Sequence, residues 1–229
     1  MEIGYAHLPG LRMAYRCWGP PGGRPLLALH AGSVPGETWA GLAAALGDST
    51  RGYAPDLRGF GATDRPGRYG LEVMRDDVRA LLDALGIHRV TLVGHSLGAV
   101  VAYLLAEEHP DRVAALVLEE PPPPVPLGLR PSPRPQGPLP YDWAVREAVL
   151  AQLNDPDPAW WERLAEITAP ALVVAGGPSS HLPQERLAAM ADRLPCGELV
   201  TIDAGHAVHA SRPDEFHRVV RAFLARTVG

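Results

Sequence analysis

Short apolar runs alternate with helical patterns along most of the chain. Apolar runs, which are typical of strands buried on both faces, occupy residues 26–30, 90–93, 113–118, 171–175 and 199–202, and residues 52–57 are predicted as a further short strand. Between them, apolar residues recur at helical spacing over residues 38–46, 71–85 and 99–108. Strands that alternate with helices predict a single α/β domain with a mostly parallel sheet and helices on both faces.

The alternation is interrupted between residues 121 and 168. This segment begins with four consecutive prolines and stays proline-rich as far as residue 140, which favours polyproline II or irregular structure. We therefore divide the chain into residues 1–120 and 169–229, which form the two parts of the core, and an inserted lid over residues 121–168.

The inserted segment is expected to contain two short amphipathic helices, at residues 143–153 and 158–167. A linker with packing aromatics is the alternative to a lid, but loops that follow parallel strands commonly bind ligands. Trp143, Trp160 and Trp161 are then candidates for an apolar wall of the substrate pocket.

The charge balance excludes several kinds of partner and cofactor. The 229 residues include 21 basic and 26 acidic side chains, so the surface has no electrostatic footprint for nucleic acid or anionic lipid. All the basic residues are arginines, and without lysine there is no Schiff base, no lysine-bound pyridoxal phosphate and no P-loop lysine. A small-molecule substrate is the expected partner.

The chain carries no recognisable targeting or membrane segment. Its first eight residues lack the basic and apolar regions of a signal peptide, and no apolar run approaches the roughly 20 residues of a membrane span. Cys17 and Cys196 form no C-x-x-C pattern and are interpreted as ordinary small hydrophobic residues. We expect a cytoplasmic protein with no membrane partner.

The strongest chemical motif is Gly94-His95-Ser96-Leu97-Gly98, which follows a strand and precedes a helix. A serine between two such glycines in this context is typical of a nucleophile elbow, a sharp turn that brings chain segments too close for a Cβ. The sequence therefore predicts Ser96 as a nucleophile.

A serine hydroxyl needs a base beside it, and nine histidines compete for that role. We choose His206, because it follows the last strand. In sheets whose nucleophile lies on such an elbow, the chain order is nucleophile, then acid, then histidine. His209 stands three residues further on and resembles a second metal ligand, but the sequence shows no matching acidic or cysteine cluster. We predict no metal ion and no organic cofactor.

Four segments together resemble the α/β-hydrolase superfamily, namely 29–32 (LHAG), 55–61 (PDLRGFG), 94–98 (GHSLG) and 204–206 (AGH). The resemblance covers nearly the whole chain outside the proline-rich segment. It implies that the backbone N–H groups of Gly32 and Leu97 hold the oxyanion of the reaction. Ala31 departs from the glycine usual in the family, and its small side chain is expected to leave the loop intact.

The triad acid departs more seriously from the family pattern. The family places an aspartate after the strand that precedes the histidine, and here Ser179 stands at that place. Some members instead take the acid from the end of the strand that follows the elbow helix, where this chain has Glu119 and Glu120. Successive strand residues point to opposite faces, so only one of the two can face His206. We choose Glu120, with Glu119 in reserve.

These residues predict a serine hydrolase that acts on a carbonyl substrate, a carboxylic ester before all others, through an acyl-enzyme. A serine nucleophile argues against dehalogenase and epoxide-hydrolase chemistry, which needs a carboxylate nucleophile on this fold. Two alternatives remain open. One is a binding protein or weakly catalytic hydrolase on the same fold, suggested by Ser179, and the other is a cofactor-free carbon–carbon bond hydrolase.

Overall fold

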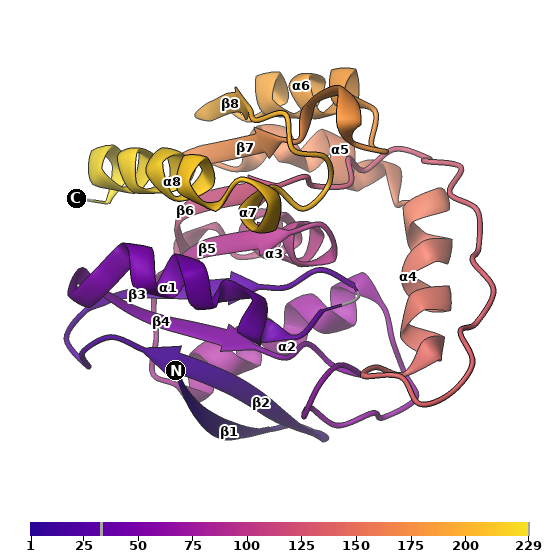
Figure 1. The fold of residues 1–229 in the computed structure, drawn as a ribbon, viewed down its shortest axis with the longest axis horizontal. Coiled ribbons are helices and arrows are strands. Elements are labelled where there is room, and N and C mark those ends of the chain that lie inside the picture. Colours follow the sequence, from indigo (N-terminus) through magenta and orange to yellow (C-terminus); the bar gives the residue numbers. More distant parts are fainter. Residues whose placement is uncertain (33, 229) are drawn as a thin grey trace.

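The computed structural model describes residues 1–32 and 34–228, in which eight strands form one twisted sheet (Figure 1). The strands are β1 (Glu2–Leu8), β2 (Leu11–Trp18), β3 (Arg24–Leu29), β4 (Thr50–Pro55), β5 (Val90–His95), β6 (Val113–Glu119), β7 (Ala171–Ala175) and β8 (Gly197–Thr201). Their order across the sheet is β1-β2-β4-β3-β5-β6-β7-β8. β1 and β2 are antiparallel to their neighbours, and β3 to β8 are parallel. The expected mostly parallel sheet is confirmed.

Helices cover both faces of this sheet. They are α1 (Ala40–Leu46), α2 (Leu71–Ala84), α3 (Leu97–Glu108), α4 (Trp143–Asn154), α5 (Pro158–Arg163), α6 (Gln184–Arg193), α7 (Val208–Ser211) and α8 (Pro213–Thr227). Short 3₁₀ turns occupy Gly36–Trp39, Gly47–Ser49, Pro110–Arg112, Leu164–Glu166 and Gly177–Ser179.

The two faces of the sheet belong to two apolar cores. On one face Leu27 and Leu29 of β3 share a core with α2, α3 and α6. On the other face Leu26 and Ala28 of the same strand share a core with α1 and α8. The central strands β3, β5, β6 and β7 are largely apolar because both faces of the sheet are covered there, and this explains why apolar runs predicted them.

The hairpin of β1 and β2 is absent from the sequence expectations. β1 lies at the edge of the sheet, and its Ile3 and Tyr5 are exposed, so it shows no buried apolar run. The expected helix over residues 158–167 is shorter, because α5 ends at Arg163 and continues as the 3₁₀ turn Leu164–Glu166.

The segment between β6 and β7 runs past the carboxyl ends of the parallel strands, where α4 stands upright at the right of the view (Figure 1). Residues 121–140 contain neither helix nor strand, as the prolines predict. Side-chain hydrogen bonds fasten α4 at its end: Asn154 bonds both the N–H and the carbonyl of Leu129, at 2.7 and 2.8 Å, and Gln152 Oε1 accepts from Leu71 N at 2.7 Å.

None of the helices in the described part of the chain has the length and apolar character needed to cross a bilayer.

Candidate active site

Ser96 occupies a tight turn between β5 and α3. Its φ is +52°, a left-handed conformation that non-glycine residues rarely adopt. A Cβ on Gly94 would lie 2.5 Å from the carbonyl oxygen of Gly98, and one on Gly98 would collide with the carbonyl oxygen of Leu29. Both glycines of the motif are therefore required by close backbone packing, and the turn lifts Ser96 to the carboxyl edge of the sheet.

His206 and Glu120 meet at the same edge of the sheet. His206 lies in the loop after β8, directly after Gly205, whose φ is +72°. Glu120 is the first residue after β6 and also has a positive φ, +45°. Its Oε2 lies 3.1 Å from Nδ1 of His206, and its carboxylate is fully buried. The imidazole thus has a carboxylate within hydrogen-bond distance of Nδ1, the arrangement found in Ser-His-Asp triads.

Three further donors surround the Glu120 carboxylate. Gly176 N donates to Oε1 at 2.5 Å, Gln184 Nε2 donates to Oε1 at 3.2 Å, and the Ser180 hydroxyl donates to Oε2. Burial alone would raise the pKa of Glu120, but the hydrogen bonds from His206, Ser180 and Gly176 outweigh it and lower that pKa below its ordinary value. The carboxylate is therefore held ionised in a buried position.

Sequence reasoning missed the role of the loop after β7 in holding this acid. Ser179, at the family's usual aspartate place, donates its hydroxyl to Asp203 at 3.0 Å and does not touch Glu120. Its neighbour Ser180, together with Gln184, reaches the Glu120 carboxylate instead. The only signal available was that this loop follows a parallel strand adjacent to β6.

Glu119, the reserve candidate, faces a different histidine. Its carboxylate accepts from the backbone N of His209 at 2.8 Å, and both its oxygens lie within 2.9 Å of His209 Nδ1. The two glutamates therefore point to different partners, as alternation about a strand end requires.

Ser96 and His206 line one cavity of about 400 Å³. The other lining residues come from the loops after β3, β4, β6 and β7, the elbow, α4 and the segment from His206 into α7: Ala31, Gly32, Val34, Thr38, Phe60, His95, Leu97, Leu129, Val145, Arg146, Val149, Leu150, Leu153, His181, Ala207, His209 and Ala210. Of the five α4 residues that line the cavity, four are aliphatic. The cavity therefore suits a largely apolar substrate group beside the nucleophile.

The two predicted oxyanion donors adjoin each other at this cavity. A Cβ on Gly32 would lie 3.8 Å from Cδ2 of Leu97, so the loop after β3 touches the elbow. His30 supports that loop, since Nε2 accepts from Leu57 N at 2.8 Å and Nδ1 lies 2.7 Å from the carbonyl oxygen of Ala31. The alanine at position 31 fits without displacing these contacts.

The structure corrects the expected pocket wall, because none of the three tryptophans is among the cavity-lining residues of the described chain. Trp160 is the buried residue of α5 and packs in the apolar core. Trp161 packs against the guanidinium of Arg193, and Trp143 stacks on Tyr141. Trp143 lies at the first turn of α4, off the face that carries Val145 and Val149 into the cavity.

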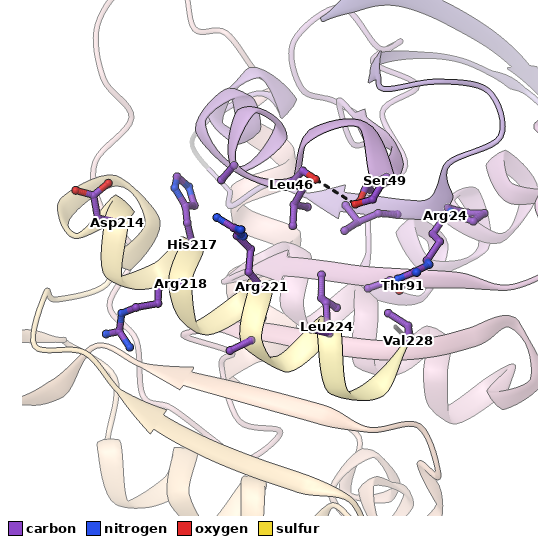
Figure 2. A pocket seen from close by; sticks show the side chains of 16 residues that line it. Arg24, Leu46, Ser49, Thr91, Asp214, His217, Arg218, Arg221, Leu224 and Val228 are labelled. Carbon is purple, nitrogen blue, oxygen red and sulfur yellow. Dashed lines mark hydrogen bonds between the residues drawn. The ribbon is translucent and has the colours of Figure 1, made fainter.

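A larger groove of about 790 Å³ lies at the opposite end of the sheet (Figure 2). Arg24 and Thr91 line it from the beginnings of β3 and β5, and His217 and Arg221 line it from α8. Its volume is the larger of the two, but among its described lining residues no nucleophile stands beside a base. Ligands of open α/β sheets bind at the carboxyl ends of the strands, where Ser96 lies.

The parallel sheet and the strained serine turn at its carboxyl edge define the class of protein, a hydrolase built on the α/β-hydrolase fold. The comparisons agree, because a family model described as alpha/beta hydrolase fold matches residues 24–163, more than half of the chain. The chain belongs to this family.

Relatives of the chain include hydrolases that act on different substrates. The chain is 43% identical over 102 residues to 2-hydroxymuconate semialdehyde hydrolase of Pseudomonas sp. (strain CF600). That match covers 42% of this chain and only 36% of the relative's length.

Two solved structures match over almost their whole length. A hydrolase from Pseudomonas aeruginosa PA01 has a TM-score of 0.84 at 26% identity, covering 97% of this chain and 98% of its own. A thermophilic esterase from Thermogutta terrifontis has a TM-score of 0.84 at 25% identity, covering 99% of both chains.

Proposed function

We propose that the protein hydrolyses carboxylic esters through an acyl-enzyme on Ser96. The observation that carries this proposal is the buried contact between the Glu120 carboxylate and His206 Nδ1, on a histidine that shares a cavity with Ser96. A carboxylate in that place orients the imidazole and supports its positive charge, which a site for binding alone does not need. The structural likeness to an esterase points to the same bond type.

In the first half of the reaction, Ser96 Oγ attacks the ester carbonyl carbon while His206 Nε2 accepts the hydroxyl proton. The tetrahedral intermediate then collapses, and the imidazolium returns the proton to the departing alcohol. In the second half, water attacks the acyl-enzyme, His206 again accepts and returns the proton, and the carboxylic acid leaves. Glu120 stays ionised throughout and stabilises the imidazolium.

The backbone N–H groups of Gly32 and Leu97 are the proposed oxyanion donors. Their two segments adjoin at the cavity beside Ser96, which supports this assignment. Removing one donor from such a site typically costs about 2.7–4 kcal/mol of transition-state stabilisation. We also propose that residues 121–168 act as the lid, since α4 supplies aliphatic side chains to the cavity.

The test is hydrolysis of p-nitrophenyl acetate and butyrate by the wild type, Ser96→Ala and Glu120→Gln. We expect Ser96→Ala to abolish turnover, and Glu120→Gln to lower kcat by on the order of 10⁴-fold with little change in KM, because the amide no longer stabilises the imidazolium. Ser179→Ala is the matched control at the family's usual acid place, and it should keep nearly full activity. Turnover in Ser96→Ala equal to the wild type contradicts the proposal.

Carbon–carbon bond hydrolysis is the second candidate, favoured by the 43% identity to a 2-hydroxymuconate semialdehyde hydrolase. The same serine and histidine would serve both reactions, so only substrate comparison separates them. Ser96-dependent loss of 2-hydroxymuconate semialdehyde absorbance at a higher kcat/KM than ester hydrolysis would select this candidate.

The binding-protein alternative loses its main argument in the structure. It depended on the neutral Ser179 at the acid place, whereas the Glu120 carboxylate now stands against His206.

A further inference from the structure

Three buried side chains form a cluster behind the catalytic histidine. One ligand atom from each of His95, Glu119 and His209 lies within 4.8 Å of the others. Glu119 is fully buried, and His95 and His209 are 4% and 8% exposed. The carboxylate that the sequence did not associate with His209 is therefore supplied by the end of β6, and a second imidazole is supplied by the end of β5.

His95 presents an unused nitrogen lone pair. Its Nε2 lies 2.7 Å from the carbonyl oxygen of His206, and because a carbonyl only accepts, Nε2 carries the proton. The neutral ring then has a lone pair at Nδ1. This atom is buried and has no hydrogen-bond partner among residues 1–32 and 34–228. Buried polar atoms are rarely left unpaired, so we expect this lone pair to be bound by a hydrogen-bond donor or a metal cation.

The outer nitrogens of both imidazoles are already bonded in the way that metal-ligating histidines require. Thr38 Oγ1 lies 2.7 Å from His209 Nε2, and the His206 carbonyl holds His95 Nε2. Such partners fix the ring orientation and leave the opposite nitrogen for a metal ion. Trp39 stacks on His209, with ring centroids 4.7 Å apart, and holds the imidazole from one side.

We propose that His95 Nδ1, Glu119 and His209 Nδ1 bind a divalent transition-metal ion of the Zn²⁺ type, and that this ion inhibits the hydrolase. Two imidazole nitrogens and one carboxylate oxygen are a donor set for zinc and its neighbours, whereas Mg²⁺ and Ca²⁺ prefer oxygen alone. Ligands about 2.1 Å from the ion span about 4.2 Å at most, so small side-chain rotations close the site.

The ion reaches this cluster through the catalytic cavity. His95 and His209 both line that cavity, and its water supplies a fourth ligand. The ion takes the place of the proton between His209 Nδ1 and Glu119, and that proton passes to solvent.

Inhibition rests on the proposed function of His206. The His95 and His206 ring centroids are 5.0 Å apart, so the ion adds positive charge close to an imidazole that must itself become positive during acyl transfer. We expect kcat to fall about tenfold at saturating metal, with a smaller change in KM. Removal of the metal by EDTA should restore the rate.

Binding is tested without reference to activity, by adding Co²⁺ to metal-free full-length protein and recording its visible absorption bands. Calorimetry with Zn²⁺ gives the stoichiometry. We expect one ion per chain, and Glu119→Gln, nearly isosteric with the wild type, should weaken binding at least tenfold. His209→Ala is a second variant, and circular dichroism establishes that each variant is folded.

His206→Ala is the control. His206→Ala removes the catalytic imidazole but none of the three ligands, so it should keep the Co²⁺ bands even though hydrolysis is lost. Absence of binding by the wild type, or bands that vanish in His206→Ala but persist in Glu119→Gln, overturns the site. Stoichiometric binding that leaves ester hydrolysis unchanged overturns the inhibition and leaves the catalytic proposal standing.

Discussion

At the scale of single residues, the turn around Ser96 depends on two missing Cβ atoms. Gly94 packs against the beginning of α3, and Gly98 packs against the carbonyl oxygen of Leu29 at the end of β3. The strained φ of Ser96 persists because these contacts leave the backbone no room to relax.

Replacing Gly98 by alanine should force β3 and α3 apart. We expect Gly98→Ala to lower the free energy of unfolding by about 1–3 kcal/mol, the usual effect of overpacking, and to abolish ester hydrolysis. Denaturant unfolding and initial rates measure the two effects. Gly22→Ala is the matched control, because a Cβ there meets nothing within 4 Å. Equal stability and activity of Gly98→Ala and Gly22→Ala would contradict this account of the turn.

The sequence was sufficient to predict the residues whose roles depend on local pattern. The position of Ser96 between a strand and a helix predicted it as the nucleophile, and the alignment of the strand ends predicted Glu120, whose Oε2 lies 3.1 Å from His206 Nδ1. Ser180 and Gln184 escaped prediction, because their contacts with Glu120 depend on the path of the loop after β7. The Glu119 and His209 contact was missed because it depends on the path of the chain after β8, which places His209 against the end of β6.

At the scale of secondary-structure elements, a buried carboxyl links α3 to α5. Glu107 Oε2 lies 3.4 Å from Arg163 Nε, and Oε1 has no partner among the described residues. Burial, only partly offset by Arg163, raises the pKa of Glu107 to about 8. The folded protein therefore binds this proton more tightly than the unfolded chain does. The stabilisation that this proton binding gives the folded state is complete below about pH 4.5 and is lost as the pH rises through about 8.

Glu107→Gln should remove this pH dependence. At pH 9 the variant should be more stable than the wild type by on the order of 2 kcal/mol, and at pH 5 the two should be nearly equal. Urea unfolding at both pH values measures the difference. Glu108→Gln changes the exposed neighbouring carboxyl and should show neither effect. A stabilisation of Glu107→Gln that is the same at pH 5 and pH 9 contradicts the assigned pKa.

The inner face of α4 should set the length of acyl group that the cavity accepts. Leu150→Trp places a larger side chain in the cavity, so we expect kcat/KM for p-nitrophenyl hexanoate to fall at least tenfold while the acetate ester changes little. Glu147→Trp introduces the same side chain on the exposed face of the helix and should leave both rates unchanged. Equal losses for both esters in Leu150→Trp would argue against α4 as the acyl wall.

The elements were predictable where burial is two-sided. The buried strands β3 to β7 were predicted from the sequence, whereas the exposed edge strand β1 was not. β8, at the opposite edge, is also mostly exposed, and it was predicted from residues 199–202. The expectation for the tryptophans failed because helix rotation decides which face meets the cavity. Val145, Val149 and Leu153 recur at intervals of four and line it, and Trp143 does not.

At the scale of the whole molecule, the sheet separates two hollows at its opposite ends. The carboxyl edge gathers Ser96, His206 and Glu120 from three distant segments, and the amino edge carries the groove of Arg24 and Arg221 (Figure 2). The alternation of strands and helices predicted the fold and placed the site at the carboxyl edge. The cavity's apolar lining depends on how α4 packs across that edge, and the sequence of residues 121–168 did not predict this packing.

The central claim, that Ser96 is a nucleophile activated by His206 and Glu120, is tested most directly by covalent labelling. Phenylmethylsulfonyl fluoride sulfonylates activated serines, and intact-mass and peptide analysis locate the added group. We predict one label per chain on the peptide that contains Ser96, much slower labelling of Glu120→Gln, and none of Ser96→Ala. Labelling that bypasses Ser96, or that proceeds at the wild-type rate in Glu120→Gln, would contradict the account.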